Sequence, residues 1–411
     1  MAAIPRKPIL ISGAGISSLL LARSLLGNAI PFLIFERDSS PVFRAQGYRL
    51  RLSSEGLDAI ESVLDPEGWK KFWDACGKTG GVGFSPINAV TGVIDESGGA
   101  PQVPAGGRRG EKEPEKKMAE ALTSRDGKIV GISRGDMRRI FFEGCEEFVR
   151  WSHAVVGYEL TGTGVRAIFA DGTKSEEGEM LVAGDGIHSK VAKQVSGGLL
   201  KVFDTGAIVI HGQTPTAAFK GLGEGVWMLS DEGNERGKMY VFTNVRPVER
   251  DDPSVLFGWT MIAEPGIIDP PKNTDDIIGE TAAEVAKRVT AHWHPGLRPI
   301  FDSMVAKDAT FLKVTCSTPT GVPEWENKPR VTVIGDAAHS MTPAGGVGAN
   351  TAMRDAALLG RLLREKGGWG EEVGRAYEGA MREFAGEAVR LSYELARGQI
   401  GIVIGEGTRT V

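Results

Sequence analysis

The stretch that decides the fold is "LISGAGISS", residues 10–18. An apolar run ends at Gly13, Gly15 follows after one residue, and "ISSLLLARSLLGN" then reads as a helix. The next run, "IPFLIFER", has the composition of a second buried strand, so the N-terminal region predicts a strand–helix–strand unit. Two of the three glycines of a dinucleotide fingerprint are present, and Ser18 replaces the third.

This turn fits either a nucleotide site or a glycine turn between a strand and a helix. In a dinucleotide site Gly13 would make the tight turn, and Gly15 would let the backbone approach a pyrophosphate at the helix N-terminus. Ser18 takes the third glycine's position, and its side chain is small enough that we expect only a modest loss of helix packing. Glu36 ends the second strand, where an acid binds ribose hydroxyls in such sites. The context favours the nucleotide site without deciding it.

The bulk composition is that of an ordinary globular protein. The chain has 411 residues, of which 41% are hydrophobic and 25% charged. A net charge of −5 provides no long-range attraction for nucleic acid or anionic lipid. The three cysteines are far apart and contain no CxxC pair, which argues against a disulfide framework or a metal site. No segment predicts a signal peptide or a membrane span, so we expect a cytoplasmic protein.

Two later segments each place Gly-Asp at the end of an apolar run: "LVAGDGIHSKV" at 181–191 and "VTVIGDAAHSMTPAGGVGANTAMRDAALL" at 331–359. With the N-terminal turn they form three markers in order, GxGxx, DG and GD. In these markers the sequence resembles the single-component FAD-dependent monooxygenases of the para-hydroxybenzoate hydroxylase family, of the fungal secondary-metabolism type. The resemblance runs from about residue 8 to residue 365.

The resemblance implies roles for individual residues. Glu36 would bind the adenosine ribose, Asp336 the ribityl chain, and Asp185 with Gly186 would lie near the pyrophosphate. Pro343 would lie beside the flavin ring, where the "GGVGAN" turn opens a helix whose dipole favours negative charge. The complete set of cofactor-binding residues that we expect is Gly13, Gly15, Ser17, Ser18, Glu36, Arg37, Arg49, Arg138, Asp185, Gly186, Gly335, Asp336, Pro343, Gly346, Gly348, Ala349 and Asn350.

The family implies an α/β fold, with a Rossmann-like FAD-binding domain, an inserted antiparallel-sheet substrate domain and C-terminal helices. The four strand-like runs between residues 205 and 263 fit the inserted sheet. We expect a discontinuous FAD-binding domain, a substrate domain with a flexible loop at about 95–117, and a C-terminal helical segment. The FAD-binding domain would comprise residues 1–80, 123–200 and 310–365. The substrate domain would comprise residues 81–122 and 201–309. The C-terminal helical segment would comprise residues 366–411.

The reaction implied by the resemblance uses NADPH or NADH to reduce FAD, and O2 to form a C4a-hydroperoxyflavin. That flavin would hydroxylate or epoxidise an apolar aromatic, indole or polyketide-type small molecule. The sequence names no catalytic base. Arg49, Arg51 and Pro343 are candidates to support the chemistry, because both arginines fall on one face of a predicted strand. A solvated strand edge explains the two arginines equally well.

Two other interpretations stay open. The family often carries an arginine where this chain has Ala192, and that departure leaves room for a non-redox cyclase that holds FAD structurally. A non-enzymatic binding protein is the third interpretation, and the intact GD motif argues against it. Aromatic residues of the inserted sheet fit a substrate pocket or the sheet core: His211, Trp227, Tyr240, Phe242 and Trp259.

Overall fold

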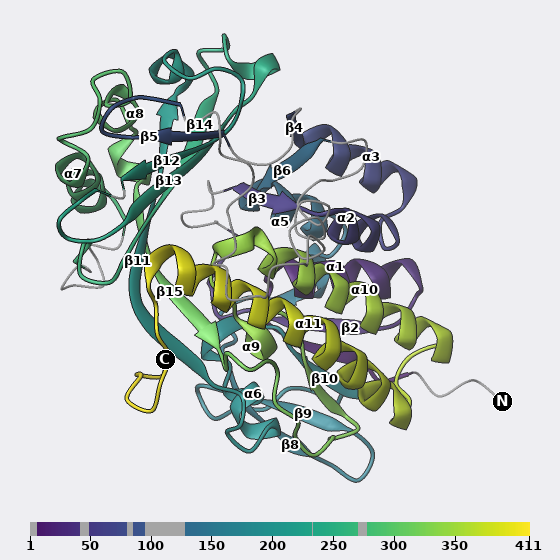
Figure 1. Ribbon diagram of the computed structural model, residues 1–411. Helices are drawn as coiled ribbons and strands as arrows, with labels where there is room; N and C mark the ends of the chain where they lie inside the picture. Colours follow the sequence, from purple (N-terminus) through teal and green to yellow (C-terminus); the bar gives the residue numbers. More distant parts are fainter. Residues whose placement is uncertain (1–5, 42–48, 80–84, 95–127, 232, 270–277) are drawn as a thin grey trace, which may run out of the picture.

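A five-stranded parallel sheet forms the base of the molecule in the computed structural model (Figure 1). The structure describes residues 6–41, 49–79, 85–94, 128–231, 233–269 and 278–411. The strand order is β16 (Val331–Val333), β10 (Met180–Ala183), β1 (Ile9–Ser12), β2 (Phe32–Phe35) and β7 (Val149–Arg150). All four neighbouring pairs are parallel. The predicted N-terminal strand–helix–strand unit is β1, α1 (Ile16–Gly27) and β2.

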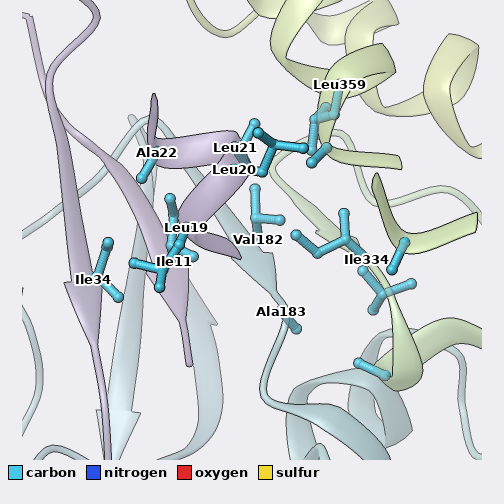
Figure 2. Close-up of a cluster of buried hydrophobic side chains, with 14 of the residues drawn as sticks. Ile11, Leu19, Leu20, Leu21, Ala22, Ile34, Val182, Ala183, Ile334 and Leu359 are labelled. Carbon is cyan, nitrogen blue, oxygen red and sulfur yellow. The ribbon is translucent and has the colours of Figure 1, made fainter. Parts of the chain in front are cut away.

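Helices cover this sheet, which explains why its strands are continuous apolar runs rather than alternating ones. Helix α1 lies against α10 (Gly348–Lys366), and the long C-terminal helix α11 (Glu371–Ile400) packs on α10. Figure 2 shows the shared core, with labelled side chains from β1, α1, β2, β10 and α10 and from the end of β16: Ile11, Leu19, Leu20, Leu21, Ala22, Ile34, Val182, Ala183, Ile334 and Leu359.

A second, six-stranded sheet carries its own apolar core, as the sequence predicts for the inserted sheet. Its order is β15 (Thr310–Ser317), β11 (Val202–Pro215), β14 (Leu256–Ala263), β13 (Met239–Val245), β12 (Gly225–Asp231) and β5 (Ser85–Asn88). Helices α7 (Glu280–Val289) and α8 (Pro299–Asp302) lie beside it (Figure 1). Strand β15 falls within the range predicted for the FAD-binding domain, yet it pairs with β11. The domain boundaries as a whole stay a prediction.

A three-stranded sheet of β3 (Arg49–Leu52), β6 (Ile129–Ser133) and β4 (Gly77–Thr79) forms a third element. It carries α2 (Ser54–Glu61), α3 (Pro66–Ala75) and α5 (Arg134–Phe142). Ser133 caps α5 by accepting a hydrogen bond from the N–H of Asp136. A hairpin of β8 (Val155–Leu160) and β9 (Val165–Phe169) completes the described strands.

Two predictions remain, the flexible loop at about 95–117 and the C-terminal helical segment. The segment 95–117 lies outside the described residues. Helix α11 fills most of the predicted C-terminal segment, and Thr410 then bridges back to Phe203 at the start of β11. Within the described part of the chain, no helix combines the length and the apolar character that crossing a membrane requires.

Candidate functional site

The three Gly-containing turns meet at one edge of the five-stranded sheet. Strands β1, β10 and β16 are neighbours and run parallel, so their carboxyl ends share an edge. The turn after β1 touches the turn after β10, because a Cβ added to Gly13 would lie 2.8 Å from the Cα of Asp185. A Cβ added to Gly335, after β16, would lie 2.8 Å from the Oγ of Ser17 at the start of α1. Motifs that are far apart in sequence thus form one surface, at the edge where such sheets bind ligands.

The first turn contains two glycines with different constraints. Gly13 has a φ of +88° and abuts the backbone of residues 184 and 185, so only glycine fits there. Gly15 has a φ of −74°, and the nearest atom to an added Cβ would be the Gly184 carbonyl oxygen at 3.6 Å. The protein itself therefore leaves space beside Gly15, at the positive end of α1, whose first turn carries no acidic residue. This space suits an anion.

Ser18 fits the third glycine position because its neighbour is a glycine. The Ser18 side chain is fully buried, and its Oγ lies 3.4 Å from the Gly184 carbonyl oxygen. A Cβ added to Gly184 would lie only 2.2 Å from that Oγ. The close packing that the fingerprint requires is thus kept, because the residue without a side chain is Gly184 in the turn after β10 instead of a glycine in α1.

Glu36 is buried at the end of β2 and joins the first turn to the strand. Its Oε2 accepts a hydrogen bond of 2.6 Å from the N–H of Ala14, and its Oε1 accepts one from Asp38 at 3.0 Å. Arg138 of α5 donates to the carbonyl oxygen of Ala14 at 2.9 Å. Burial lowers the pKa of Arg138, and the charge of Glu36 opposes this shift. A carboxylate has about four acceptor positions, so Glu36 retains capacity for ribose hydroxyls.

The DG turn presents a carboxylate and an open backbone. Burial raises the pKa of Asp185, against hydrogen bonds from Ser189 and Ser12 and the charge of the exposed Arg37. The Oδ1 atom of Asp185 has no hydrogen-bond partner among the described residues. Gly186 has a φ of +79°, and no atom lies within 4 Å of an added Cβ. The turn therefore offers an acceptor and room for a ligand.

The GD turn is held by a carboxylate that the sequence analysis missed. Asp355 of α10 is fully buried, and its Oδ2 accepts from the N–H of Gly335 at 2.7 Å and lies 2.6 Å from Nε2 of His339. Burial lowers the pKa of His339, but the charge of Asp355, its hydrogen bond and the charge of Asp336 raise the pKa overall. A signal was available, because Asp355 falls on the helix face of Ala352, Ala356 and Leu359, which is otherwise apolar.

The turn at 343–350 lies against β3. Asn350 ties the two together: its amide donates to the carbonyl oxygens of Arg51 at 3.0 Å and Gly346 at 2.9 Å, and it accepts from the N–H of Ser53 at 2.9 Å. Both donors of the amide are therefore occupied by protein. Pro343 is exposed, and the first turn of α10, which holds Gly348 and Ala349, carries no acidic residue.

A cavity of about 410 Å³ lies where the three-stranded and six-stranded sheets approach each other. Arg49 reaches it, whereas the Cβ and Cδ of Arg51 lie 3.8 Å from the position of a Cβ added to Gly346. Burial lowers the pKa of both arginines to about 10. The two side chains are thus half-buried rather than fully solvated. The cavity is lined by Arg49, Ala75, Ser133, Asp136, Gln213, Arg246, Glu249, Val255, Leu256 and Gly258.

The aromatic candidates of the inserted sheet lie elsewhere. Trp227 and Trp259 belong to the core between the sheet and α7 and α8, and Tyr240 belongs to the core beneath α11. Phe242 packs against that second core, and His211 is buried. The lining of the cavity contains none of these five residues among those the structure describes. Sheet packing explains their positions.

These features fit FAD. The space beside Gly15 suits a pyrophosphate, the Oδ1 of Asp185 has no protein partner, and Gly186 leaves its surroundings open. In the part of the chain that is described, no group of three or more His, Cys, Asp or Glu side chains could hold a metal ion.

Residues 143–392, more than half of the chain, match the model of a family described as "FAD binding domain". The chain belongs to this family. The matched range contains the DG and GD turns, and the family assignment confirms the predicted resemblance and its cofactor, FAD.

Two curated fungal relatives support the family assignment. The dual O-methyltransferase/FAD-dependent monooxygenase elcB of Phaeosphaeria nodorum is 30% identical over 410 residues, which cover 89% of this chain and 41% of that protein. The chain therefore spans less than half the length of that relative. The FAD-dependent monooxygenase thnD of Trichoderma harzianum is 27% identical over 369 residues, covering 86% of this chain and 82% of the relative.

A solved structure shows the same fold. Klebsiella pneumoniae HpxO, complexed with FAD and uric acid, aligns with a TM-score of 0.72 over 96% of this chain and 89% of that one, at 20% identity. The predicted fold class is thereby confirmed: a Rossmann-like FAD-binding sheet, an antiparallel sheet and C-terminal helices.

Proposed function

We propose that this chain is an FAD-dependent monooxygenase that uses NADPH or NADH and O2 to hydroxylate or epoxidise a small aromatic, indole or polyketide-type molecule. The observation that carries the proposal is the meeting of the GxGxx, DG and GD turns at the carboxyl ends of β1, β10 and β16. When bound, FAD supplies two-electron chemistry with the nicotinamide nucleotide and O2. The protein supplies the binding and the orientation of the reactants.

The first two turns would hold the ADP half of FAD. The N–H groups at the start of α1 and the space beside Gly15 would receive the pyrophosphate. Glu36 would accept hydrogen bonds from the ribose, while its own bonds to Ala14 and Asp38 fix its orientation. Arg138 would keep the turn in place through the carbonyl oxygen of Ala14. Each of these groups is preorganised by the protein before the ligand binds.

The GD turn and the start of α10 would hold the flavin half. Asp336 follows Gly335, whose N–H is fixed by Asp355, so the carboxylate is well placed to bind the ribityl chain. The positive end of α10 would stabilise negative charge on the ring. Asn350 contributes by positioning, because it ties the 343–350 turn to β3.

Two further observations support the proposal, one on the substrate cavity and one on the cellular compartment. The cavity between the sheets would take the substrate and separate the reacting groups from bulk water. The three free, buried cysteines are consistent with a reducing compartment, and we propose the cytoplasm.

The test is spectroscopic and kinetic. The purified protein should be yellow, release FAD on denaturation, and oxidise NADPH or NADH in an O2-dependent manner when a substrate is present. Protein that cannot bind FAD would refute the proposal. FAD that no nicotinamide nucleotide reduces, even with substrates that the protein converts, would favour a non-redox cyclase instead.

A further inference from the structure

Two buried hydroxyl groups join the C-terminal helix α11 to the turn that follows the GD motif. The hydroxyl of Thr342 donates to the carbonyl oxygen of Ser392 at 2.9 Å, and the hydroxyl of Ser392 donates to the carbonyl oxygen of Thr342 at 2.9 Å. The two hydroxyl oxygens lie 2.7 Å apart, and both residues are at most 2% exposed. The pair is reciprocal, because each hydroxyl fixes the backbone of the other residue.

The surroundings of the pair are apolar, which makes the presence of two hydroxyls informative. Val389, Tyr393 and Leu395 of α11 form a core with Ala344 of the turn. A buried hydroxyl costs free energy unless it is hydrogen-bonded, and replacing both partners with apolar groups of the same shape is often neutral for stability. Valine and alanine would fill nearly the same space. What the hydroxyls add is direction, since their hydrogen bonds orient the backbone of Thr342.

The turn beyond Thr342 has little that fixes its own conformation. Gly345 and Gly346 have φ values of +78° and +62°, and glycine restricts the backbone least of all residues. Among the described side chains, none caps the first residues of α10. The N–H of Ala344 donates to the Oγ1 of Thr342 at 3.3 Å, so the backbone of the turn is oriented by the same hydroxyl that bonds α11.

The turn is thus held at its two ends by two different elements. Asn350 anchors the far end to β3, and the Thr342–Ser392 pair anchors the near end to α11. Helix α11 also contacts β15, β16 and the short helix α9 (Asp336–His339) (Figure 1). The C-terminal helix therefore braces the GD motif and the turn after it from behind.

We propose that Thr342 and Ser392 are positioning residues for the flavin half of FAD, through which α11 sets how strongly the protein favours reduced over oxidised flavin. This inference rests on the proposed function, in which the positive end of α10 faces negative charge on the ring. Reduction adds negative charge to the flavin, and the turn that begins at Thr342 places this helix end. A turn released from α11 would stabilise the added charge less.

The experiment measures the relative affinity of the protein for reduced and oxidised FAD, which a purely structural role would leave unchanged. The FAD content of the wild type is determined first, by release on denaturation. The midpoint potential of the bound flavin is then measured at pH 8 by anaerobic equilibration with a reference dye. Its displacement from the potential of free FAD gives the ratio of the two affinities.

The variants remove the pair from both sides. They are Ser392→Ala, Thr342→Val and the double variant, together with Thr342→Ser, which keeps the hydroxyl. The matched control is Thr290→Val, which removes a buried hydroxyl at the end of α7, where it donates to the carbonyl oxygen of Ala286 at 2.8 Å. Urea unfolding of every variant shows how much stability each change costs.

We expect Ser392→Ala and Thr342→Val each to lower the affinity ratio by about three- to tenfold, which shifts the potential by about −15 to −30 mV for a two-electron couple. The double variant should shift it no further than the larger single one, because the two hydroxyls act as a unit. Thr342→Ser should stay within about twofold of the wild type. Thr290→Val should lower the urea midpoint and leave the ratio unchanged.

Three results would overturn the inference. The first is a single variant that binds FAD with an unchanged or raised ratio, since the pair would then only stabilise the fold. The second is a shift in Thr342→Ser as large as that in Thr342→Val, which would assign the effect to side-chain shape. The third is additive shifts in the double variant.

The test survives the loss of one variant and separates two kinds of failure. If either Ser392→Ala or Thr342→Val does not fold, the other carries the measurement, because each removes the same pair. Wild-type protein without FAD would refute the proposed function itself. Wild-type protein that holds FAD, with variants whose potentials do not move, would refute only the role of α11.

Discussion

Alanine substitutions at Gly13 and Gly15 separate a folding role from a ligand-binding role within one turn. A Cβ at Gly13 would lie 2.8 Å from both the Cα of Asp185 and the carbonyl oxygen of Gly184, on a residue with a φ of +88°. At Gly15, φ is −74° and ψ is 173°, which alanine adopts readily, and the nearest atom would be 3.6 Å away. The same methyl group, added two residues apart, therefore clashes with backbone at Gly13 but makes only an ordinary van der Waals contact at Gly15.

The magnitudes follow from these contacts. Gly13→Ala should lower the free energy of unfolding by about 2–5 kcal/mol, from the left-handed φ at about 1–2 kcal/mol and overpacking at about 1–3 kcal/mol. Gly15→Ala should change it by less than about 0.5 kcal/mol, because the poorer N-cap and the lower entropy of the unfolded chain oppose each other. The methyl at Gly15 blocks the pyrophosphate, so FAD should bind at least about tenfold more weakly, and Gly15→Val should abolish binding.

Urea unfolding with and without FAD measures the first quantity, and fluorescence titration with FAD measures the second. The informative result is the crossed pattern, with stability lost at Gly13 and affinity lost at Gly15. If the Gly15→Val protein holds FAD at the wild-type level, the assignment of this turn to the pyrophosphate is wrong. If Gly13→Ala is as stable as the wild type, the steric reasoning fails.

The packing around the three turns makes further outcomes testable. Ser18→Gly should leave FAD affinity unchanged and lower the free energy of unfolding by about 0.5 kcal/mol, because glycine is a poorer helix former than serine in the first turn of α1; thermal melts and FAD titration check this. Gly184→Ala places a methyl 2.2 Å from Ser18 Oγ, so adding Ser18→Gly should restore part of the lost melting temperature. Equal melting temperatures for the single and the double variant would contradict this reasoning. Burial lowers the pKa of His339 but Asp355 raises it by more, so the stability contributed by the pair is present below the ordinary histidine pKa and is lost as pH rises through the raised value. The difference in urea midpoint between wild type and His339→Gln should therefore shrink from about pH 6 to about pH 9, and a constant difference would contradict the pairing. Burial raises the pKa of all three cysteine thiols to about 11 or 12, so a thiol reagent at neutral pH should label none in the folded protein and three in urea.

Much of the site could be predicted from sequence because its parts are local. A glycine turn between an apolar strand and a helix is encoded by the residues of the turn itself, as at Gly13. The GD and DG motifs follow buried strands in the same way, and parallel strands present their carboxyl ends together. The three motifs in order carried the family resemblance that implied the fold class, and the structure then showed that all three lie at one edge of the parallel sheet.

Other parts could not be predicted, because they depend on contacts between distant segments. Ser18 is compatible with the fingerprint only because Gly184 lies opposite it, 166 residues away. Asp355 reaches Gly335 across the gap between α10 and the end of β16. The sequence shows that both residues are present, yet their register against each other depends on how the helices lie on the sheet.

The amino-acid sequence by itself determined the strand–turn–helix units, their order and the identity of the cofactor family, since these follow from backbone preferences within short segments. Only the tertiary structure decided which polar groups are paired. It assigned the inserted-sheet aromatics to sheet packing, and it brought Arg49 and Arg246 into one cavity from two different sheets. Burial and pairing arise from the approach of separate surfaces, and no local pattern records that approach.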